Sequence, residues 1–170
     1  MVYQLPLGRR GAWLHGHWLG RILGGWSTSV VTVMQSGAPI TVQTQTNTTH
    51  AYSAGPQRAD VLRDPNLPPR LRRPERWFDT EAFAQPPEYQ FGNQGVGLVR
   101  ADGRINFNCS LIRSFHVSEK KRLQVRGEFF NLPNHPNFGN PGRTFQGPGF
   151  GIVSSARPGR QVQMGMRLTY

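Results

Sequence analysis

The sequence predicts an all-β protein of antiparallel strands, and three observations lead to this fold class. Residues 105–115, 122–131 and 160–170 alternate apolar with polar side chains, which is the period of a strand. The chain contains 20 glycines and 14 prolines in 170 residues, which favours turns over helices. It has no run of about 18 apolar residues, so a transmembrane helix is excluded by length.

The three C-terminal segments each have one apolar and one polar face. Each is about ten residues long, which suits a soluble antiparallel sheet and also a tilted strand that crosses a bilayer. Periodicity alone favours the soluble sheet, because single membrane strands give weak signals. In the last segment the apolar face consists of Val162, Met164, Met166, Leu168 and Tyr170.

Two further strands are predicted in the N-terminal part of the chain. Residues 2–7 alternate briefly, and Pro6 limits them to a strand end or a sheet edge. Residues 26–35 are rich in β-branched side chains, and a bulge after the turn at residues 36–39 extends this strand to residue 43.

Two long connections, residues 44–104 and 132–159, show no strand or helix period. Seven prolines between residues 46 and 104 exclude a helix or a central strand there. Asp79 is suited to cap a short helical turn through Ala82 and Phe83. Connections of this length are usually functional or disordered.

The net charge of +11 is unevenly distributed along the chain. Residues 46–104 are nearly neutral, and in the remainder only Glu119 and Glu128 oppose twelve basic residues. Such an excess of positive charge is compatible with binding to nucleic acid and also with binding to phosphorylated lipid. Cys109 is the only cysteine, which excludes an intramolecular disulfide, and we expect it to be inert.

Five collinear motifs resemble one family, the TonB-dependent outer-membrane receptors. The closest resemblance is to the Oar-like subfamily, whose members carry a carboxypeptidase-regulatory-like domain. The first two motifs are Gly25-Trp26 with residues 35–42 (QSGAPITV), and residues 64–68 (DPNLP) with 77–83 (WFDTEAF). The others are residues 91–95 (FGNQG) with 100–103, residues 123–141 (LQVRGEFFN to NHPNFGNP), and an Arg-Gln strand that ends at Tyr170.

This resemblance implies a transmembrane β-barrel, of which the chain is a C-terminal part with about five strands and long extracellular loops. The short turn at residues 116–121 is then periplasmic. Five strands cannot close a barrel, so we expect that the isolated chain does not function and that its start is a truncated gene prediction or a degraded reading frame. No export signal follows Met1, so we expect one on additional sequence.

The same resemblance assigns roles to the strand residues. Gly165, Leu168 and Tyr170 form a C-terminal barrel-assembly signal, and the polar face turns to the lumen or the plug. Arg113 shares the apolar face, so we expect its side chain to extend to the periplasmic headgroups. The lumen- or plug-facing residues are Arg126, Glu128, Gln163 and Arg167, and the lipid-facing residues are Phe107, Leu111, Phe115, Leu123, Val125, Phe129, Met164 and Met166.

No enzyme is expected, because no catalytic triad spacing, phosphate-binding loop or carboxylate pair occurs. No cofactor or metal is expected either, since His15 and His17 lack a nearby third ligand. His135 is expected to be part of a turn. Arg143, Arg157 and Arg160 are candidates for pairing with the phosphates of lipid A.

The partners implied by the resemblance are the rest of the barrel with its plug, the TonB complex, the barrel-assembly machinery and outer-membrane lipid, and not nucleic acid. The resemblance therefore implies substrate uptake across the cell outer membrane. The alternative is a soluble basic β-sandwich that binds nucleic acid or anionic glycans. It requires the apolar strand faces to meet in a common core.

Overall fold

The computed structural model describes residues 2–4, 24–51 and 55–170. Within this part of the chain, no helix is long and apolar enough to span a membrane. The chain divides into two compact units. Unit 1 contains the long strands (residues 1–34, 105–135 and 158–170), and unit 2 consists of Gln35–Arg104 and Pro136–Arg157.

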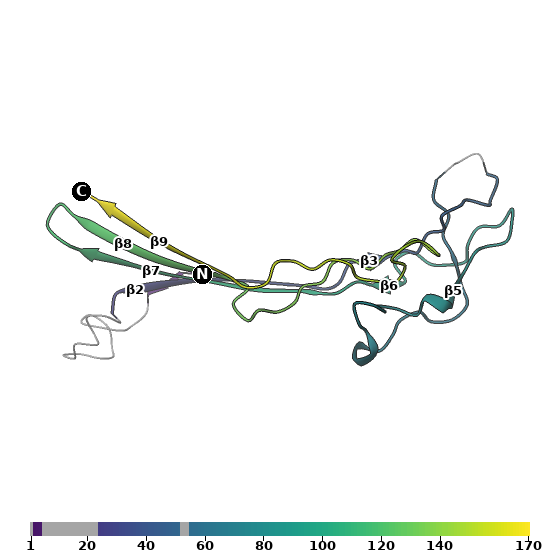
Figure 1. The fold of residues 1–170 in the computed structure, drawn as a ribbon, viewed down its shortest axis with the longest axis horizontal. Helices are drawn as coiled ribbons and strands as arrows, with labels where there is room; N and C mark the ends of the chain where they lie inside the picture. Colours follow the sequence, from purple (N-terminus) through teal and green to yellow (C-terminus); the bar gives the residue numbers. More distant parts are fainter. Residues whose placement is uncertain (1, 5–23, 52–54) are drawn as a thin grey trace. The chain divides into compact units, whose positions relative to one another are not determined.

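Unit 1 is a single antiparallel sheet of five strands in the order β1-β2-β7-β8-β9 (Figure 1). The strand β2 covers the predicted residues 26–35 without the predicted extension, whereas β7 is one residue longer at each end than predicted. The strands β8 and β9 begin and end within one residue of the prediction, and residues 5–7 of the first predicted strand lie outside the described residues. The bounds are Val2–Gln4 (β1), Trp26–Gln35 (β2), Arg104–His116 (β7), Arg122–Phe130 (β8) and Gln161–Thr169 (β9).

A tight turn joins β7 to β8. The Val117 amide donates to the Lys121 carbonyl (2.9 Å), and the Lys121 amide donates to the Ser118 carbonyl (3.2 Å). In the register of the hairpin, His116 lies opposite Arg122 and Cys109 lies opposite Phe129. The turn therefore fixes which side chains of the two strands share a face.

The strand predicted to continue to residue 43 instead ends at Gln35. Pro39–Ile40 form a short strand, β3, which pairs with β6 (Val99–Arg100) in a separate sheet. Gly37 explains the change of partner, because a Cβ atom there would lie 1.9 Å from the Ala101 carbonyl oxygen. This close backbone approach, rather than a bulge, redirects the chain into unit 2.

Unit 2 is compact, so the two long connections form an ordered unit. Its regular elements are short, and turns and side-chain hydrogen bonds link them. The Asp79 side chain accepts a hydrogen bond from the Glu81 amide at the start of η2, which confirms the predicted cap. The elements are β3, β4 (Asp60–Val61), η1 (Pro69–Leu71), η2 (Thr80–Ala82), β5 (Phe83–Ala84) and β6, and β4 pairs with β5.

A hydrophobic core lies at the centre of unit 2. Phe78 is 1% exposed, and its ring contacts Phe83 (centroids 5.7 Å apart) and Phe150 (5.3 Å) edge to face. Edge-to-face pairs of this kind add to the stability gained from burial. The buried apolar residues of the described chain all belong to this core: Ile40, Val42, Ala59, Trp77, Phe78, Ala82, Phe83, Val99, Ala101 and Val153.

Both long connections contribute to this core and are joined by backbone hydrogen bonds. The Gln43 amide donates to the Arg143 carbonyl (2.9 Å), and the Trp77 amide donates to the Gly151 carbonyl (2.9 Å). The Gln94 side chain, 1% exposed, pairs with the backbone groups of Val42 as a neighbouring strand would. With its amide nitrogen facing the Val42 carbonyl, it donates to that oxygen (3.0 Å) and accepts from the Val42 amide (3.1 Å).

Replacing Gly92 with alanine is expected to destabilise unit 2 by about 1–3 kcal/mol. A Cβ atom at this position would lie 2.0 Å from the Arg58 carbonyl oxygen, so backbone must shift. Gly95 in the same motif is the matched control, because its Cβ would meet no atom within 4 Å. Hydrogen exchange of the Arg58 region measures the difference, and equal effects at the two glycines would contradict the steric explanation.

Candidate functional site

The eight residues predicted to face lipid lie on one face of the unit 1 sheet. Directly opposite residues of an antiparallel pair point to the same face. Leu123 lies opposite Phe115 and Leu168, and Val125 lies opposite Met166. The same register places Met164 opposite Gly127, and Leu111 opposite Gly127 on the other side. We call this surface the apolar face.

The apolar face is exposed at β9, where Met164 is 78% and Met166 is 80% exposed. In the described part of the chain, the buried apolar residues belong to unit 2 and none to the long strands. The sandwich alternative requires these strand faces to meet in a core, and the described strands of unit 1 form one sheet without such a core. An exposed apolar surface of this extent marks a contact with lipid or protein.

Aromatic side chains gather on the apolar face near the β7–β8 hairpin. Phe115 lies one residue from the end of β7, and Tyr170 follows the end of β9 at the same end of the sheet. Trp26, at the start of β2, belongs to this group because the Arg113 guanidinium lies over its ring (6.0 Å) and over the Phe115 ring (4.3 Å). Belts of aromatic residues are typical of membrane interfaces.

The polar face carries the four residues predicted to face a lumen or a plug. Gln163 lies opposite Glu128, and Arg167 lies opposite Gln124. Arg126 and Glu128 are neighbours on this face of β8 and form an ion pair. The structure therefore brings these residues onto one surface, on the side of the sheet away from the apolar face.

The glycines of the strands differ in the space around them. A Cβ atom at Gly127 would lie 3.3 Å from the Met164 sulfur, so a larger residue needs only a small shift of that flexible side chain. At Gly165 a Cβ atom would meet no atom within 4 Å. The geometry thus gives no packing reason for Gly165, and the assembly signal of Gly165, Leu168 and Tyr170 stays a prediction.

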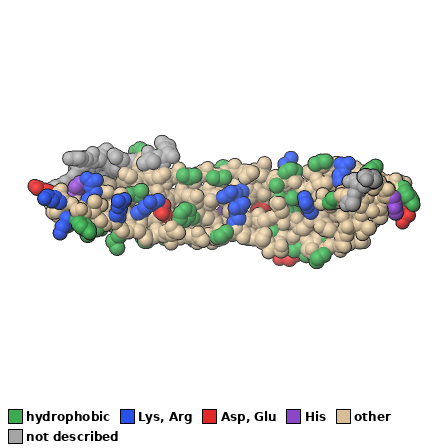
Figure 2. All heavy atoms as spheres, turned by 90° about the horizontal axis from the view of Figure 1, so that it is seen from above, with side chains coloured by type: hydrophobic (Ala, Val, Ile, Leu, Met, Phe, Trp, Pro, Cys, Tyr) green, Lys and Arg blue, Asp and Glu red, His purple; other side chains and the backbone are tan. Residues whose placement is uncertain are grey.

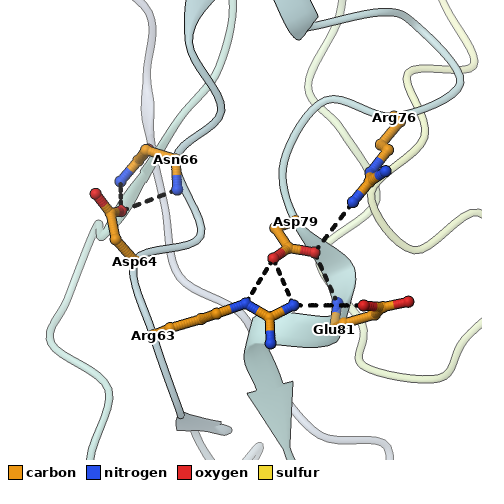
Figure 3. Close-up of polar contacts among 6 residues, drawn as sticks. All are labelled: Arg63, Asp64, Asn66, Arg76, Asp79 and Glu81. Carbon is orange, nitrogen blue, oxygen red and sulfur yellow. Dashed lines mark hydrogen bonds and ion pairs between the residues drawn. The ribbon is translucent and has the colours of Figure 1, made fainter.

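Unit 2 carries an ion-pair network centred on Asp79 (Figure 3). The Asp79 carboxylate accepts hydrogen bonds from Arg63 Nε (2.9 Å) and Arg76 (3.3 Å), in addition to the Glu81 amide (3.3 Å). The Asp79 side chain is only 13% exposed, whereas both arginines are mostly in solvent. Partial burial raises the pKa of Asp79, but the hydrogen bond and charge of Arg63 with the Glu81 amide outweigh it and hold the pKa below its usual value.

We expect unit 2 to lose stability in acid, because this network depends on the charge of Asp79. The folded-state pKa of Asp79 lies below the unfolded value of about 3.9. The stability that the charged carboxylate contributes is therefore complete above that unfolded value and is lost as pH falls through the folded pKa. Asp79→Asn keeps a capping side chain and removes the charge. We expect it to destabilise unit 2 by about 1 kcal/mol at neutral pH, since solvent screens the exposed arginines.

The measurement is hydrogen exchange of residues 60–84, corrected for the intrinsic rate at each pH. The difference between the native protein and Asp79→Asn should shrink below about pH 4 as the carboxyl group becomes protonated in both states. A difference that is constant with pH would show that the charge of Asp79 contributes nothing.

The other residues named from the sequence lie outside the face residues and the Asp79 network. His15 and His17 lie outside the described residues, and the described residues contain no group of three His, Cys, Asp or Glu side chains arranged to hold a metal. His135 lies in a turn, where its amide donates to the Asn131 side chain (3.1 Å) and its carbonyl accepts from the same side chain (2.9 Å). The three arginines proposed for lipid A are exposed: Arg143, Arg157 and Arg160.

Charged side chains gather at the end of the sheet that carries the β7–β8 hairpin (Figure 2). The turn contributes Glu119, Lys120 and Lys121, and Arg122 begins β8. The Arg122 guanidinium lies 3.4 Å from the His116 ring nitrogen across the hairpin. The aromatic rings of the apolar face and a basic turn therefore share one end of the sheet.

Comparisons with known proteins identify the family. A family model described as "Outer membrane beta barrel domain" matches residues 1–163, which is most of the chain. No curated protein matches, and no solved structure matches. The open sheet agrees with part of such a barrel, because its two outer strands do not pair with each other. The chain therefore belongs to the outer membrane beta barrel domain family and is a protein of the outer membrane.

Proposed function

We propose that the chain forms the C-terminal strands of a TonB-dependent receptor of the Oar-like subfamily, which takes up a substrate across the outer membrane. The observation that carries the proposal is the shared face of the eight apolar residues on β7, β8 and β9. In a barrel this face contacts acyl chains, and the polar face lines the lumen.

Strand length and connection length support the same role. The strands β7, β8 and β9 have 13, 9 and 9 residues, and a transmembrane β-strand needs about 9–11. The β7–β8 connection is short, whereas the β2–β7 and β8–β9 connections form unit 2. Barrels of this class have short periplasmic turns and long extracellular loops, so unit 2 is the extracellular part.

The TonB-dependent assignment is supported by the five collinear motifs, and unit 2 gives several of them a structural role. Gly37 in the first motif and Gly92 in the third permit close backbone contacts. Trp77 and Phe78 of the second motif lie in the core, and the Trp77 indole donates to the Arg100 carbonyl (2.8 Å). The motifs thus describe the folding of the extracellular loops.

Two experiments test the proposal at separate levels. In a Cys109→Ser background, Met166→Cys and Gln163→Cys place thiols on opposite faces of β9. In native outer membranes, a water-soluble maleimide should label Gln163→Cys and leave Met166→Cys unmodified unless the membrane is dissolved. Equal labelling in intact membranes would contradict the lipid-facing assignment.

The second experiment tests the energy source. Crosslinking in the native membrane should join the complete receptor that contains this chain to the periplasmic domain of TonB, because the proposed receptor draws on that complex for transport. A barrel that inserts with the expected labelling pattern but never crosslinks to TonB would be an outer-membrane protein of another kind.

A further inference from the structure

We infer that Arg113 and the aromatic rings beside it form a binding site for the phosphate of an anionic phospholipid in the periplasmic leaflet. The inference rests on the proposed function, since it requires the apolar face to contact lipid. It adds a ligand of defined chemistry at a defined place on that face.

The first argument is the position of Arg113. It lies opposite Val125 and between Leu111 and Phe115 along β7, so its charge lies on the apolar face. Arg113 lies three positions before His116, the last residue of β7, so a strand tilted by about 40° places it roughly 8 Å from that end along the membrane normal. That depth corresponds to the level where lipid phosphates meet acyl chains.

The second argument is the way the side chain is held. The Arg113 guanidinium lies 4.3 Å from the Phe115 ring centre and 6.0 Å from that of Trp26. Two cation–π contacts restrict the rotamers of a long side chain, and the rings bring no negative charge. A guanidinium presents N–H groups in a fixed fork that matches phosphate oxygens, which makes arginine better suited than lysine to this ligand.

The third argument is charge complementarity. The residues of β7, β8 and β9 that share the apolar face include no acidic side chain. The neighbouring turn adds Lys120 and Lys121, and Arg122 begins β8. Glu119 is the one acidic residue of this turn. A partner that is anionic at the head and apolar beyond it fits this surface, and a phosphatidylglycerol molecule has both properties.

The test compares Arg113→Gln with Arg167→Gln in the native protein, reconstituted in nanodiscs of phosphatidylcholine with one-third phosphatidylglycerol. Arg167 lies at nearly the same level of the sheet but on the polar face, opposite Gln124. Both variants lose one positive charge, so they differ in the face from which it is removed. Native mass spectrometry counts the phosphatidylglycerol molecules that stay bound after release from the nanodisc.

The expected result is at least a fivefold loss of retained phosphatidylglycerol for Arg113→Gln and no change for Arg167→Gln. Arg113→Lys should retain an intermediate amount, because it keeps the charge and loses the fork. Equal retention by Arg113→Gln and the native protein, or equal loss in both variants, overturns the site. Neither result contradicts the proposal that the apolar face contacts lipid. If the complete receptor that contains this chain does not insert into nanodiscs, the site and the proposed function are overturned together.

Discussion

Replacing Met164 with arginine is expected to destabilise the bilayer-inserted protein by about 2–4 kcal/mol, the cost of a cation near the midplane of a lipid-facing strand. Met164 lies near the middle of β9, is 78% exposed and lies on the apolar face opposite Gly127. In the proposed barrel its side chain faces the acyl chains. Denaturant-dependent unfolding in phosphatidylcholine bilayers measures the change.

The control is the preceding residue of the same strand. Gln163→Arg introduces the same side chain on the polar face, opposite Glu128, where an opposite charge and water are available. We expect its effect to stay within about 0.5 kcal/mol, as for substitutions away from buried groups. Similar losses at both positions would mean that the two faces of β9 meet the same environment, and the membrane assignment would be wrong.

Replacing Phe78 with alanine is expected to remove about 3–5 kcal/mol from the stability of unit 2, the usual loss for truncating a buried phenylalanine. Phe78 is 1% exposed and its ring contacts Phe83 and Phe150. Phe150 belongs to the second connection, so the cavity weakens the contact between the two connections. Protection from hydrogen exchange should therefore fall in residues 59–84 and in residues 142–153.

Phe91→Ala is the matched control for this prediction. Phe91 belongs to the same unit and is 77% exposed, so its truncation removes little buried surface. We expect the hydrogen-exchange pattern of unit 2 to stay as in the native protein. If Phe78→Ala reduced protection only in the first connection, the core would not join the two connections as the ring contacts indicate.

The strands could be predicted from the sequence because their signal is local. In β9 the side chains from Gln161 to Thr169 alternate without interruption, and a period of two defines a strand and its faces together. The hairpin register then aligns the faces of β7 and β8, which the alternation had identified separately. The fold class follows from these features.

Unit 2 could not be predicted in the same way, because long-range contacts determine its core. Val42 is held by Gln94, and Phe78 is covered by Phe150, so partners lie more than 50 positions apart and no period connects them. Aromatic residues in a region otherwise rich in proline and polar side chains were the available signal. The extension of β2 to residue 43 failed for a related reason, since the redirection at Gly37 depends on Ala101.

The candidate site, too, is only partly predictable from the sequence. The faces on which Arg113 and Arg167 lie follow from alternation alone. The contact between the Arg113 guanidinium and the Trp26 ring does not, because Trp26 comes from a strand far away in sequence. Neighbours across a sheet depend on strand order, which a single strand does not encode.

The backbone hydrogen bonds between the two connections of unit 2 also affect the rate at which this unit folds. The bond from Gln43 to Arg143 spans 100 positions (143 minus 43), and the bond from Trp77 to Gly151 spans 74 (151 minus 77). Contacts between such distant positions form slowly, because the entropy of closing a large loop must be overcome before any contact stabilises it. The β7–β8 hairpin closes over a turn of five residues, so it should be complete long before the two connections meet.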